Sequence, residues 1–362
     1  MSDRRNFLRG AAASVVAGTS LLAGGTLSAS AASQLAQVKL KPKRIIALEE
    51  HFMLPEFEGY LHETQQNLKS GLVDKVVTPL SDFGQRRLDI MDEHGIDFAV
   101  LSLSGPGVQI EPDTNKAVRL ARYANDRLAA EMQKRPTRYG GFAHLAMQDP
   151  QAAADELERC VRQLQMQGGM INGETNGLYL DDRRYDVFWQ RVEELAVPVY
   201  IHPGNPPDYP HMYANHPEMW GPVWSWAAET CSHALRLVFS GTFDRFPGAK
   251  IILGHMGETL PIQIWRLDSR YKIANTKYEI QHLPSWYLRR NIMLTTSGVC
   301  DDAALRCALD SMGEHNVMFS VDYPFEDTKT ATDWIRNANI SDSERNKVAW
   351  ENAATLMKIQ HL

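Results

Sequence analysis

Cysteine is scarce in this chain: four of its 362 residues are cysteines, and no two of them form a CxxC pair. This spacing gives neither a regular disulfide framework nor a cysteine-based structural zinc site, so we expect free thiols. Basic residues are not in excess either, since 38 Lys and Arg stand against 44 Asp and Glu, for a formal net charge of -6. Because no basic stripe is present, nucleic acid is not an expected partner.

Long hydrophobic runs are also missing, so the sequence predicts no membrane span. The first apolar run, Gly10–Leu27, is rich in Ala, Gly and Ser and follows the adjacent pair Arg4 and Arg5. A charged start, a weakly apolar stretch and a small-x-small cleavage site describe a signal peptide, and Arg-Arg followed by Phe-Leu-Arg resembles a bacterial twin-arginine signal. We therefore predict that residues 1–31 direct export of the folded protein to the periplasm, and that residues 32–43 form a linker.

What the sequence does contain is a series of apolar, β-rich runs that alternate with helical patterns. The eight runs are Arg44–Phe52, Phe98–Gly105, Tyr139–Ala146, Gly168–Gly173, Val197–Pro203, Lys250–Gly257, Asn291–Gly298 and Asn316–Pro324. Nearly continuous apolar strands separated by helices are typical of parallel strands covered on both faces. Because the G-x-G-x-x-G signature of an open dinucleotide-binding sheet is missing after the first run, the pattern favours a single (β/α)8 TIM barrel over residues 44–362.

Polar residues end several of these runs, and active sites of such barrels lie at the C-terminal ends of the strands. In the first run, Glu49 and His51 share one face, because side chains alternate along a strand, and Glu50 lies on the other. A single His or Asp at a strand end is often structural, but residues from four strands that meet at one rim indicate a metal site. Mixed carboxylate and imidazole ligands suit Zn, Mn or Fe. The polar residues at these ends are Glu49, His51, His202, His255, Glu258 and Asp322.

Four of these motifs together resemble those of a known family. They are E-x-H from Glu49, His-Pro at His202, Gly-His-Met-Gly-Glu from Gly254 and Asp-Tyr-Pro-Phe-Glu from Asp322. The chain is similar to the amidohydrolase superfamily, in particular to its branch of aminocarboxymuconate semialdehyde and hydroxybenzoate decarboxylases, and most closely to the γ-resorcylate type. The resemblance extends from Arg44 to the end of the chain.

The resemblance implies a mononuclear metal centre. Glu49, His51, His202 and Asp322 would hold one divalent ion, with zinc as the first expectation and manganese as the alternative. Many hydrolytic relatives carry H-x-H in the first strand, and this chain has Glu49 in the first position. That difference favours the decarboxylase branch over hydrolysis.

The resemblance also implies the acid/base groups and the substrate contacts. His255 and Glu258 would form a hydrogen-bonded network beside the metal, and Arg266 would lie near polar groups of the substrate. The acid that protonates the ring carbon is either Asp322 or His255. Asn172, at the end of the fourth run, either points into the pocket or belongs to a turn.

The leading hypothesis is therefore an exported, metal-dependent, non-oxidative decarboxylase of a small hydroxylated aromatic acid such as 2,6-dihydroxybenzoate. The alternatives are a metal-dependent hydrolase of a lactone, cyclic ester or amide, and a catalytically silent barrel that serves in binding. The resemblance implies a homodimer or homotetramer. The loop Pro203–Pro210, with Trp226 and nearby aromatic residues, either covers the pocket or makes a subunit contact. Histidines without a strand-end position are interpreted as structural; they are His94, His144, His233, His282 and His315.

Overall fold

The computed structural model describes residues 41–64, 69 and 71–359. The predicted signal peptide and residues 32–40 of the predicted linker lie outside the described residues. None of the described helices has the length and hydropathy needed to cross a membrane.

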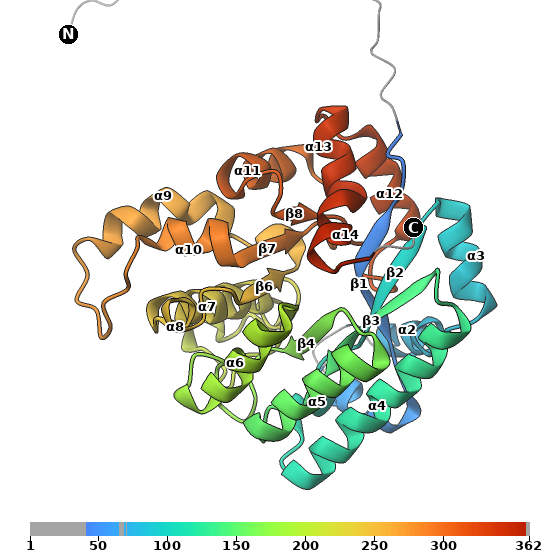
Figure 1. Ribbon diagram of the computed structural model, residues 1–362, viewed down its shortest axis with the longest axis horizontal. Helices are drawn as coiled ribbons and strands as arrows, with labels where there is room; N and C mark the ends of the chain where they lie inside the picture. Colours follow the sequence, from blue (N-terminus) through green and yellow to red (C-terminus); the bar gives the residue numbers. More distant parts are fainter. Residues whose placement is uncertain (1–40, 65–68, 70, 360–362) are drawn as a thin grey trace, which may run out of the picture. The chain divides into compact units, whose positions relative to one another are not determined.

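Eight parallel strands follow one another around a barrel in the order of the sequence. In Figure 1 they run from blue to red around the centre, with the helices outside them. The predicted (β/α)8 TIM barrel is confirmed. The strands are β1 (Ile46–Phe52), β2 (Phe98–Leu103), β3 (Tyr139–His144), β4 (Gly168–Asn172), β5 (Pro198–His202), β6 (Lys250–Leu253), β7 (Ile292–Thr295) and β8 (Val317–Met318).

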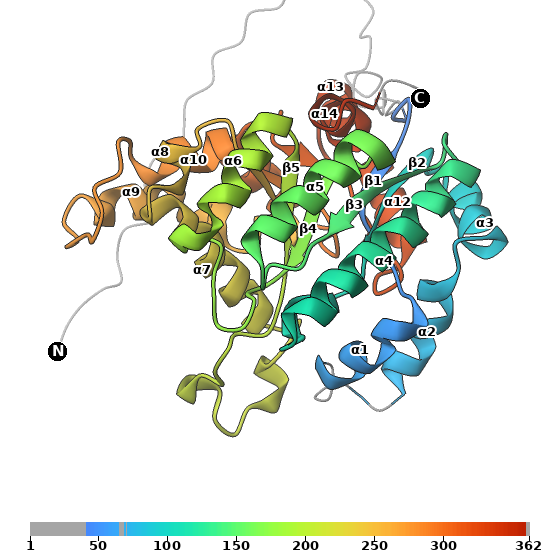
Figure 2. The same cartoon turned by 60° about the horizontal axis from the view of Figure 1, so that its bottom comes forward.

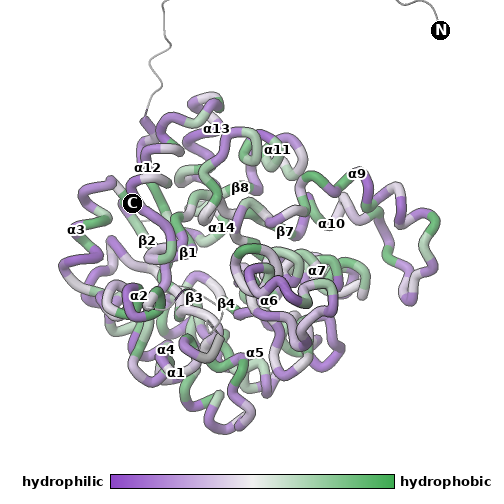
Figure 3. The backbone as a smooth tube through the Cα atoms, turned by 180° about the vertical axis from the view of Figure 1, so that it is seen from behind, coloured by the Kyte–Doolittle hydropathy of each residue, from purple (hydrophilic) through white to green (hydrophobic). Residues whose placement is uncertain are grey.

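Helices connect the strands and cover the barrel. In Figure 3 the colour along the surrounding helices changes between purple and green, as expected for helices that bury one side. The α-helices in the described ranges are α1 (Glu58–Thr64), α2 (Leu72–Ser81), α3 (Gln85–His94), α4 (Thr114–Lys134), α5 (Pro150–Leu164), α6 (Asp186–Leu195), α7 (Ser225–Phe239), α8 (Thr242–Arg245), α9 (Leu260–Tyr271), α10 (Pro284–Asn291), α11 (Asp302–Met312), α12 (Thr328–Asn337), α13 (Asp342–Asn346) and α14 (Asn352–Leu356). Short helical turns are η1 (Pro55–Phe57), η2 (Gly107–Ile110), η3 (Arg183–Tyr185), η4 (His211–Tyr213), η5 (Pro217–Met219), η6 (His255–Gly257) and η7 (Lys347–Glu351).

The last strand is much shorter than expected. The sequence predicts a strand from Asn316 to Pro324, whereas β8 ends at Met318. The Phe319 amide donates to the Val348 carbonyl at 2.8 Å, away from the strand ladder. Asp322 has a φ of 77°, a left-handed conformation that a strand does not contain. Asp322 therefore lies in an irregular segment beyond the strand.

The barrel closes between its first and last strands. Glu50 of β1 forms a parallel bridge with Tyr323, and the His51 amide donates to the Tyr323 carbonyl at 2.8 Å. β8 itself pairs with β7, so closure against β1 depends on the segment that carries Asp322.

Two apolar layers form the core because side chains along the strands alternate between the barrel interior and the helices. β1 departs from this alternation at a register shift between Ala47 and Glu50, so both Leu48 and Glu49 face the interior. The interior layer includes Leu48, Phe142 and Tyr200, and the strand–helix layer forms a larger cluster. Ala353 and Met357 pack onto the interior layer and close the end of the barrel where the strands begin. The other end, where the strands finish, carries the site.

Candidate metal centre and active site

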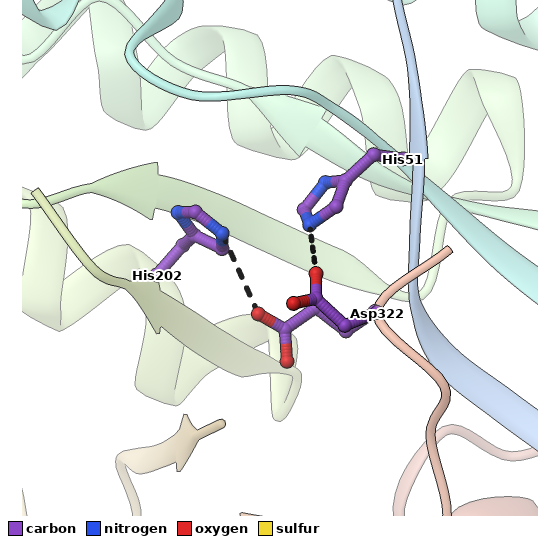
Figure 4. Close-up of side chains that lie close together, drawn as sticks. His51, His202 and Asp322 are labelled. Carbon is purple, nitrogen blue, oxygen red and sulfur yellow. Dashed lines mark ion pairs between the residues drawn. The ribbon is translucent and has the colours of Figure 1, made fainter. Parts of the chain in front are cut away.

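The structure brings the four predicted metal ligands together. Glu49 and His51 come from β1, His202 ends β5 and Asp322 follows β8. One ligand atom from each residue can be chosen so that all four lie within 4.8 Å of one another. Figure 4 shows His51, His202 and Asp322 converging from separate segments of the chain.

The ligand atoms fit a divalent cation. His51 Nε2 lies 3.2 Å from Asp322 Oδ1, and His202 Nε2 lies 3.5 Å from Glu49 Oε1. Glu49 Oε1, His51 Nε2 and Asp322 Oδ1 are buried and have no hydrogen-bond partner among the described residues. Buried polar atoms are normally satisfied, so a shared cation explains this convergence better than packing does.

Both histidine ligands are held with one nitrogen free for a metal. His51 Nδ1 forms a hydrogen bond of 3.1 Å with Ser102 Oγ, and His202 Nδ1 donates to the Pro203 carbonyl at 2.9 Å. These bonds orient the rings and leave each Nε2 directed into the site. Burial lowers the pKa of His51 to about 4 and that of His202 to about 3, so both rings are neutral at neutral pH. Neutral imidazole is the form that binds metal.

Glu49 is positioned by a set of hydroxyl groups. Its Oε2 accepts hydrogen bonds from Tyr200 and Ser297, and Thr295 Oγ1 lies 2.6 Å from the Tyr200 hydroxyl. Gly254 allows this arrangement, because a Cβ there would lie 2.7 Å from Glu49 Oε2. Glu49 Oε1 is left to face the histidines.

The four ligands Glu49, His51, His202 and Asp322 together form what we call the ligand cage. His255 lies in η6 and Glu258 directly after it, and both lie beside this cage. His255 Nδ1 donates to the Ser297 carbonyl at 3.0 Å, while its Nε2 lies 3.6 Å from Glu49 Oε1. Burial opposes the charge of His255, but Glu49, Glu258 and Asp322 outweigh it and raise its pKa to about 9. Burial raises the pKa of Glu258 to about 7. Both groups can therefore hold a proton near neutral pH.

Three histidines, His255, His202 and His51, lower the pKa of Glu49, whereas the carboxyl groups raise that of His255. Burial alone would raise the pKa of Glu49, but His255, His202 and His51 outweigh it and lower that pKa to about 2. Glu49 is therefore ionised throughout the neutral range. Burial, followed by the charge of Glu49, raises the pKa of Asp322 well above its ordinary value.

Four non-glycine residues at the site have a strained backbone. His255, Met256, Glu258 and Asp322 have φ values of 49°, 58°, 58° and 77°. Non-glycine residues in this region cost about 1–3 kcal/mol each and commonly occur at functional positions. The strained turns direct His255, Glu258 and Asp322 toward the ligand cage.

Comparison with known proteins agrees with this geometry. The profile of the amidohydrolase family matches residues 51–359. The chain belongs to the amidohydrolase family. It is 43% identical over 327 residues to γ-resorcylate decarboxylase of Polaromonas sp. strain JS666, which covers 87% of this chain and 98% of that enzyme.

Solved structures give the same picture of this amidohydrolase. A 2,6-dihydroxybenzoate decarboxylase in complex with 2,6-dihydroxybenzoate is 41% identical, with a TM-score of 0.83 over 87% of this chain and 99% of the other. The dihydroxybenzoic acid decarboxylase of Polaromonas sp. JS666, with manganese and the inhibitor 2-nitroresorcinol bound, is 43% identical. Its TM-score is also 0.83, over 87% of this chain and 97% of the other.

The two predicted substrate contacts of the amidohydrolase lie in different places. Asn172 is the register partner of His202 on the neighbouring strand, is buried, and has an unpartnered Oδ1 among the described residues. Arg266 is exposed on α9, where it lines a groove together with Arg270 and Tyr271. None of the four metal ligands lines that groove. The single chain therefore places Asn172 beside the site but not Arg266, and both roles stay predictions.

The segment between β5 and α7 carries the aromatic residues that could cover the site. Figure 2 shows this segment, in olive, extending away from the strands. Trp226, in the first turn of α7, lies where this segment ends: its ring lies 6.4 Å from the His202 ring, and its Nε1 donates to Asn205 Oδ1 in the segment at 2.6 Å. Met212 and Val223 are 75% and 70% exposed. Both predicted uses of the segment, as a cover and as a contact surface, remain compatible with this arrangement.

Sequence reasoning missed the residues that position the ligands. Tyr200 lies two residues before His202 and therefore on the same face of β5, a spacing that could have identified it. Ser297, near the end of the seventh run, donates a hydrogen bond to Glu49 and accepts one from the His255 amide at 3.0 Å. The close approach of Gly254 to Glu49 has no sequence signal.

Proposed function

We propose that this amidohydrolase is a metal-dependent, non-oxidative decarboxylase of a small hydroxylated aromatic acid, with 2,6-dihydroxybenzoate as the model substrate. The observation that carries the proposal is the cage of Glu49, His51, His202 and Asp322 with His255 beside it. The close relatives named above act on this class of acid.

The reaction replaces a carboxylate on the ring with hydrogen. Glu49, His51, His202 and Asp322 would hold a divalent metal, which would supply positive charge to orient and neutralise a carboxylate and its ortho hydroxyl group. The chain then has to deliver a proton to the ring carbon that bears the carboxylate. The C–C bond breaks, its electron pair restores the aromatic ring, and CO2 leaves.

Two residues can supply the proton. His255, whose pKa is raised to about 9, is protonated at neutral pH and directs Nε2 toward the cage. Asp322 lies at the same rim, and burial raises its pKa too. A positively charged ion bound by Asp322 and Glu49 favours the ionised form of Asp322 and also weakens the attraction of Glu49 for the proton on His255. The resemblance names Asp322, so the two assignments need a direct test.

Product analysis separates decarboxylation from hydrolysis. The protein is purified without chelator, its metal content is measured, and turnover of 2,6-dihydroxybenzoate is followed by chromatography. We expect about one equivalent of metal per chain, in line with a mononuclear site, and the appearance of resorcinol and CO2. Lactone hydrolysis without resorcinol would instead support the hydrolase alternative, and a metal-loaded protein inactive on every hydroxybenzoate would overturn the decarboxylase proposal.

The identity of the native metal ion, zinc or manganese, is the next part of the proposal. The mixed nitrogen and oxygen ligand set suits both ions, and a solved relative holds manganese. Reconstitution of the stripped protein with each ion, followed by kcat/KM measurement, identifies the ion that supports turnover. Zinc stays our first expectation, and a higher kcat/KM with manganese would overturn it.

We further propose a homodimer or homotetramer. Ile262 and Trp265 on α9 are 74% and 80% exposed, an unusual exposure for large apolar side chains. Arg266 lies on the same helix, so a role for it in substrate binding would require a second copy of the chain. Sedimentation analysis of the wild type and of Trp265→Asp tests this proposal, since a monomeric wild type would contradict it.

Export by the twin-arginine route also remains a proposal. It is supported by the Arg-Arg pair, the weakly apolar run after it and the small-x-small site in residues 1–31. Fractionation of bacterial cells that express the full chain should recover the processed protein in the periplasm. Replacement of Arg4 and Arg5 by Lys should leave it in the cytoplasm, and unchanged export would contradict the twin-arginine route.

A further inference from the structure

A buried arginine on α3 reaches the end of β1 from outside the barrel. Arg87 is 2% exposed, and its Nη2 donates to the His51 carbonyl at 2.6 Å. Its guanidinium also bonds the Asp82 and Pro79 carbonyls, at 2.8 and 3.4 Å, but forms no ion pair with a carboxylate of the described residues. The carbonyls at the end of α2 offset part of its charge. A buried charge without an ionic partner is still costly, so packing alone does not explain Arg87.

The bond from Arg87 to His51 replaces one that the irregular segment after β8 does not supply. The His51 amide donates to the Tyr323 carbonyl at 2.8 Å, as in a parallel ladder. Because the bonds of such a ladder are evenly spaced, the His51 carbonyl would next accept from the amide two residues after Tyr323, that of Phe325. The Phe325 amide instead donates to the Asp322 carbonyl at 2.9 Å, in a turn. Arg87 therefore provides the donor that the ladder lacks at this position.

The same guanidinium contacts the residue that follows Asp322. Arg87 Cζ lies 4.6 Å from the centroid of the Tyr323 ring, which is the geometry of a cation–π contact. The Tyr323 hydroxyl is buried and has no hydrogen-bond partner among the described residues, so the face of the ring makes this contact rather than the hydroxyl. Arg87 thus bonds His51 directly and contacts Asp322 through its neighbour.

His51 and Asp322 are metal ligands that meet where the barrel closes. His51 Nε2 lies 3.2 Å from Asp322 Oδ1, and neither atom has a hydrogen-bond partner among the described residues. Because Asp322, with its left-handed φ of 77°, lies beyond the end of β8, the regular ladder of the sheet does not fix the separation of these two ligands. Contacts to the residues around them have to do so.

Arg87 is suited to this role because one guanidinium can bond a carbonyl with its edge and stack on a ring with its face. We propose that Arg87 is a positioning residue that holds His51 and Asp322 at the separation needed to bind one divalent ion. It acts through the backbone of one ligand and the neighbour of the other, and is therefore not a catalytic residue. The inference rests on the metal centre of the proposed function.

The test measures metal affinity in the absence of substrate, by competition for Mn²⁺ between the protein and a chelator. Arg87→Met keeps an unbranched side chain but removes the charge and the donors. We expect the dissociation constant of Mn²⁺ to rise about 10- to 100-fold, the usual effect of losing a group that orients metal ligands. The EPR spectrum of the Mn²⁺-saturated variant should also change, because the ligand geometry changes. Arg87→Lys keeps a cation and a donor and should recover part of the affinity, and the exposed Arg119→Met on α4 should match the wild type.

Two variants of Tyr323 test the second contact and leave the hydrogen bonds of Arg87 in place. Tyr323→Phe loses only the unpartnered hydroxyl and should bind Mn²⁺ as the wild type does. Tyr323→Leu loses the face of the ring and should bind Mn²⁺ more weakly, though less so than Arg87→Met. The double variant Arg87→Met/Tyr323→Leu should bind no more weakly than Arg87→Met alone, because both substitutions remove the same contact.

The proposal is overturned if Arg87→Met lowers the free energy of unfolding but keeps the wild-type dissociation constant and EPR spectrum, because the role of Arg87 would then be structural. It is also overturned if Tyr323→Leu binds Mn²⁺ as tightly as Tyr323→Phe, a comparison that does not require Arg87→Met to fold. Failure of the proposed function is distinguishable, because the wild type would then bind Mn²⁺ but release no CO2 from any hydroxybenzoate.

Discussion

Glu49 and Glu50 are neighbours on β1, yet their surroundings give them opposite properties. Both are buried, with 0% and 4% of their surface exposed. Glu49 faces the barrel interior, where three histidines outweigh burial and lower its pKa to about 2. Glu50 faces outward, where burial dominates and raises its pKa to about 8. Because both groups are buried, the histidines around Glu49, and not burial, decide which carboxyl group is available to a metal.

Glu49 and Glu50 also differ in the hydrogen bonds that their carboxyl oxygens accept. Glu49 Oε1 has no hydrogen-bond partner among the described residues and faces the site. Glu50 Oε1 accepts from the Val321 amide at 3.0 Å and from Ser320 Oγ at 3.2 Å. Glu50 therefore binds the segment that leads to Asp322, whereas Glu49 is kept for a ligand.

The largest difference is expected when each group is neutralised without a change of shape. Glu49→Gln should abolish both metal retention and decarboxylation, since it removes the central ionised ligand. Glu50→Gln should retain the metal and most of the activity. Metal analysis and kcat/KM on both variants check this, and equal losses in the two would refute the division of roles.

A smaller loss is expected from moving Glu49 without replacing it. In Gly254→Ala the new Cβ would lie 2.7 Å from Glu49 Oε2, so the carboxylate must shift. A misplacement of this size can lower kcat/KM by about 100-fold. Gly59→Ala is the matched control, since nothing lies within 4 Å of a Cβ at that position. Full activity of Gly254→Ala would mean that Glu49 tolerates displacement.

Removal of one supporting hydroxyl should have a weaker effect. Ser297→Ala deletes a hydrogen bond to Glu49 but leaves the one from Tyr200. Loss of a group that orients a metal ligand costs on the order of tenfold in metal affinity or activity. Competition with a chelator measures the affinity, with the exposed Ser232→Ala on α7 as control. An unchanged affinity would assign Ser297 to His255 alone.

Glu50, whose carboxyl group faces outward, should affect the free energy of unfolding rather than the activity. Because its pKa is raised to about 8, folded Glu50 keeps a proton that the unfolded chain releases above its ordinary value of 4.5. This contribution is fully present below the unfolded pKa and is lost as the pH rises through the folded pKa. Glu50→Gln should therefore reduce the loss of stability on raising the pH from about 5 to 8, by up to about 1.4 kcal/mol per pH unit. Urea unfolding at several pH values measures the difference, and parallel curves would disprove it.

The sequence predicted the barrel for a physical reason, and the structure brings together the four residues that the resemblance implies as ligands. Parallel strands buried on both faces leave long apolar runs, and a polar residue at the end of such a run stands out, as His202 does. The period of two also placed Glu49 and Glu50 on opposite faces of β1. Residues in these positions are recognisable because local pattern and function coincide.

The remaining parts of the site depend on contacts between distant segments. Ser297 reaches Glu49 across 248 positions of the chain, and no local pattern records that contact. The early end of β8 follows from the hydrogen bond of Phe319 to Val348 and from the left-handed Asp322, both of which are tertiary effects.

The position of the metal ligands where the barrel closes gives them a role in folding as well as in catalysis. Glu49 and His51 belong to the first strand, and Asp322 follows the last strand. These three ligands therefore lie on both sides of the place where the Glu50–Tyr323 bridge closes the barrel. An ion bound by these ligands would connect the first strand to the segment after the last strand and so stabilise the closed barrel. Completion of the ring and acquisition of catalytic competence would then be a single event, and a chain that had not closed its barrel would be inert toward its substrate.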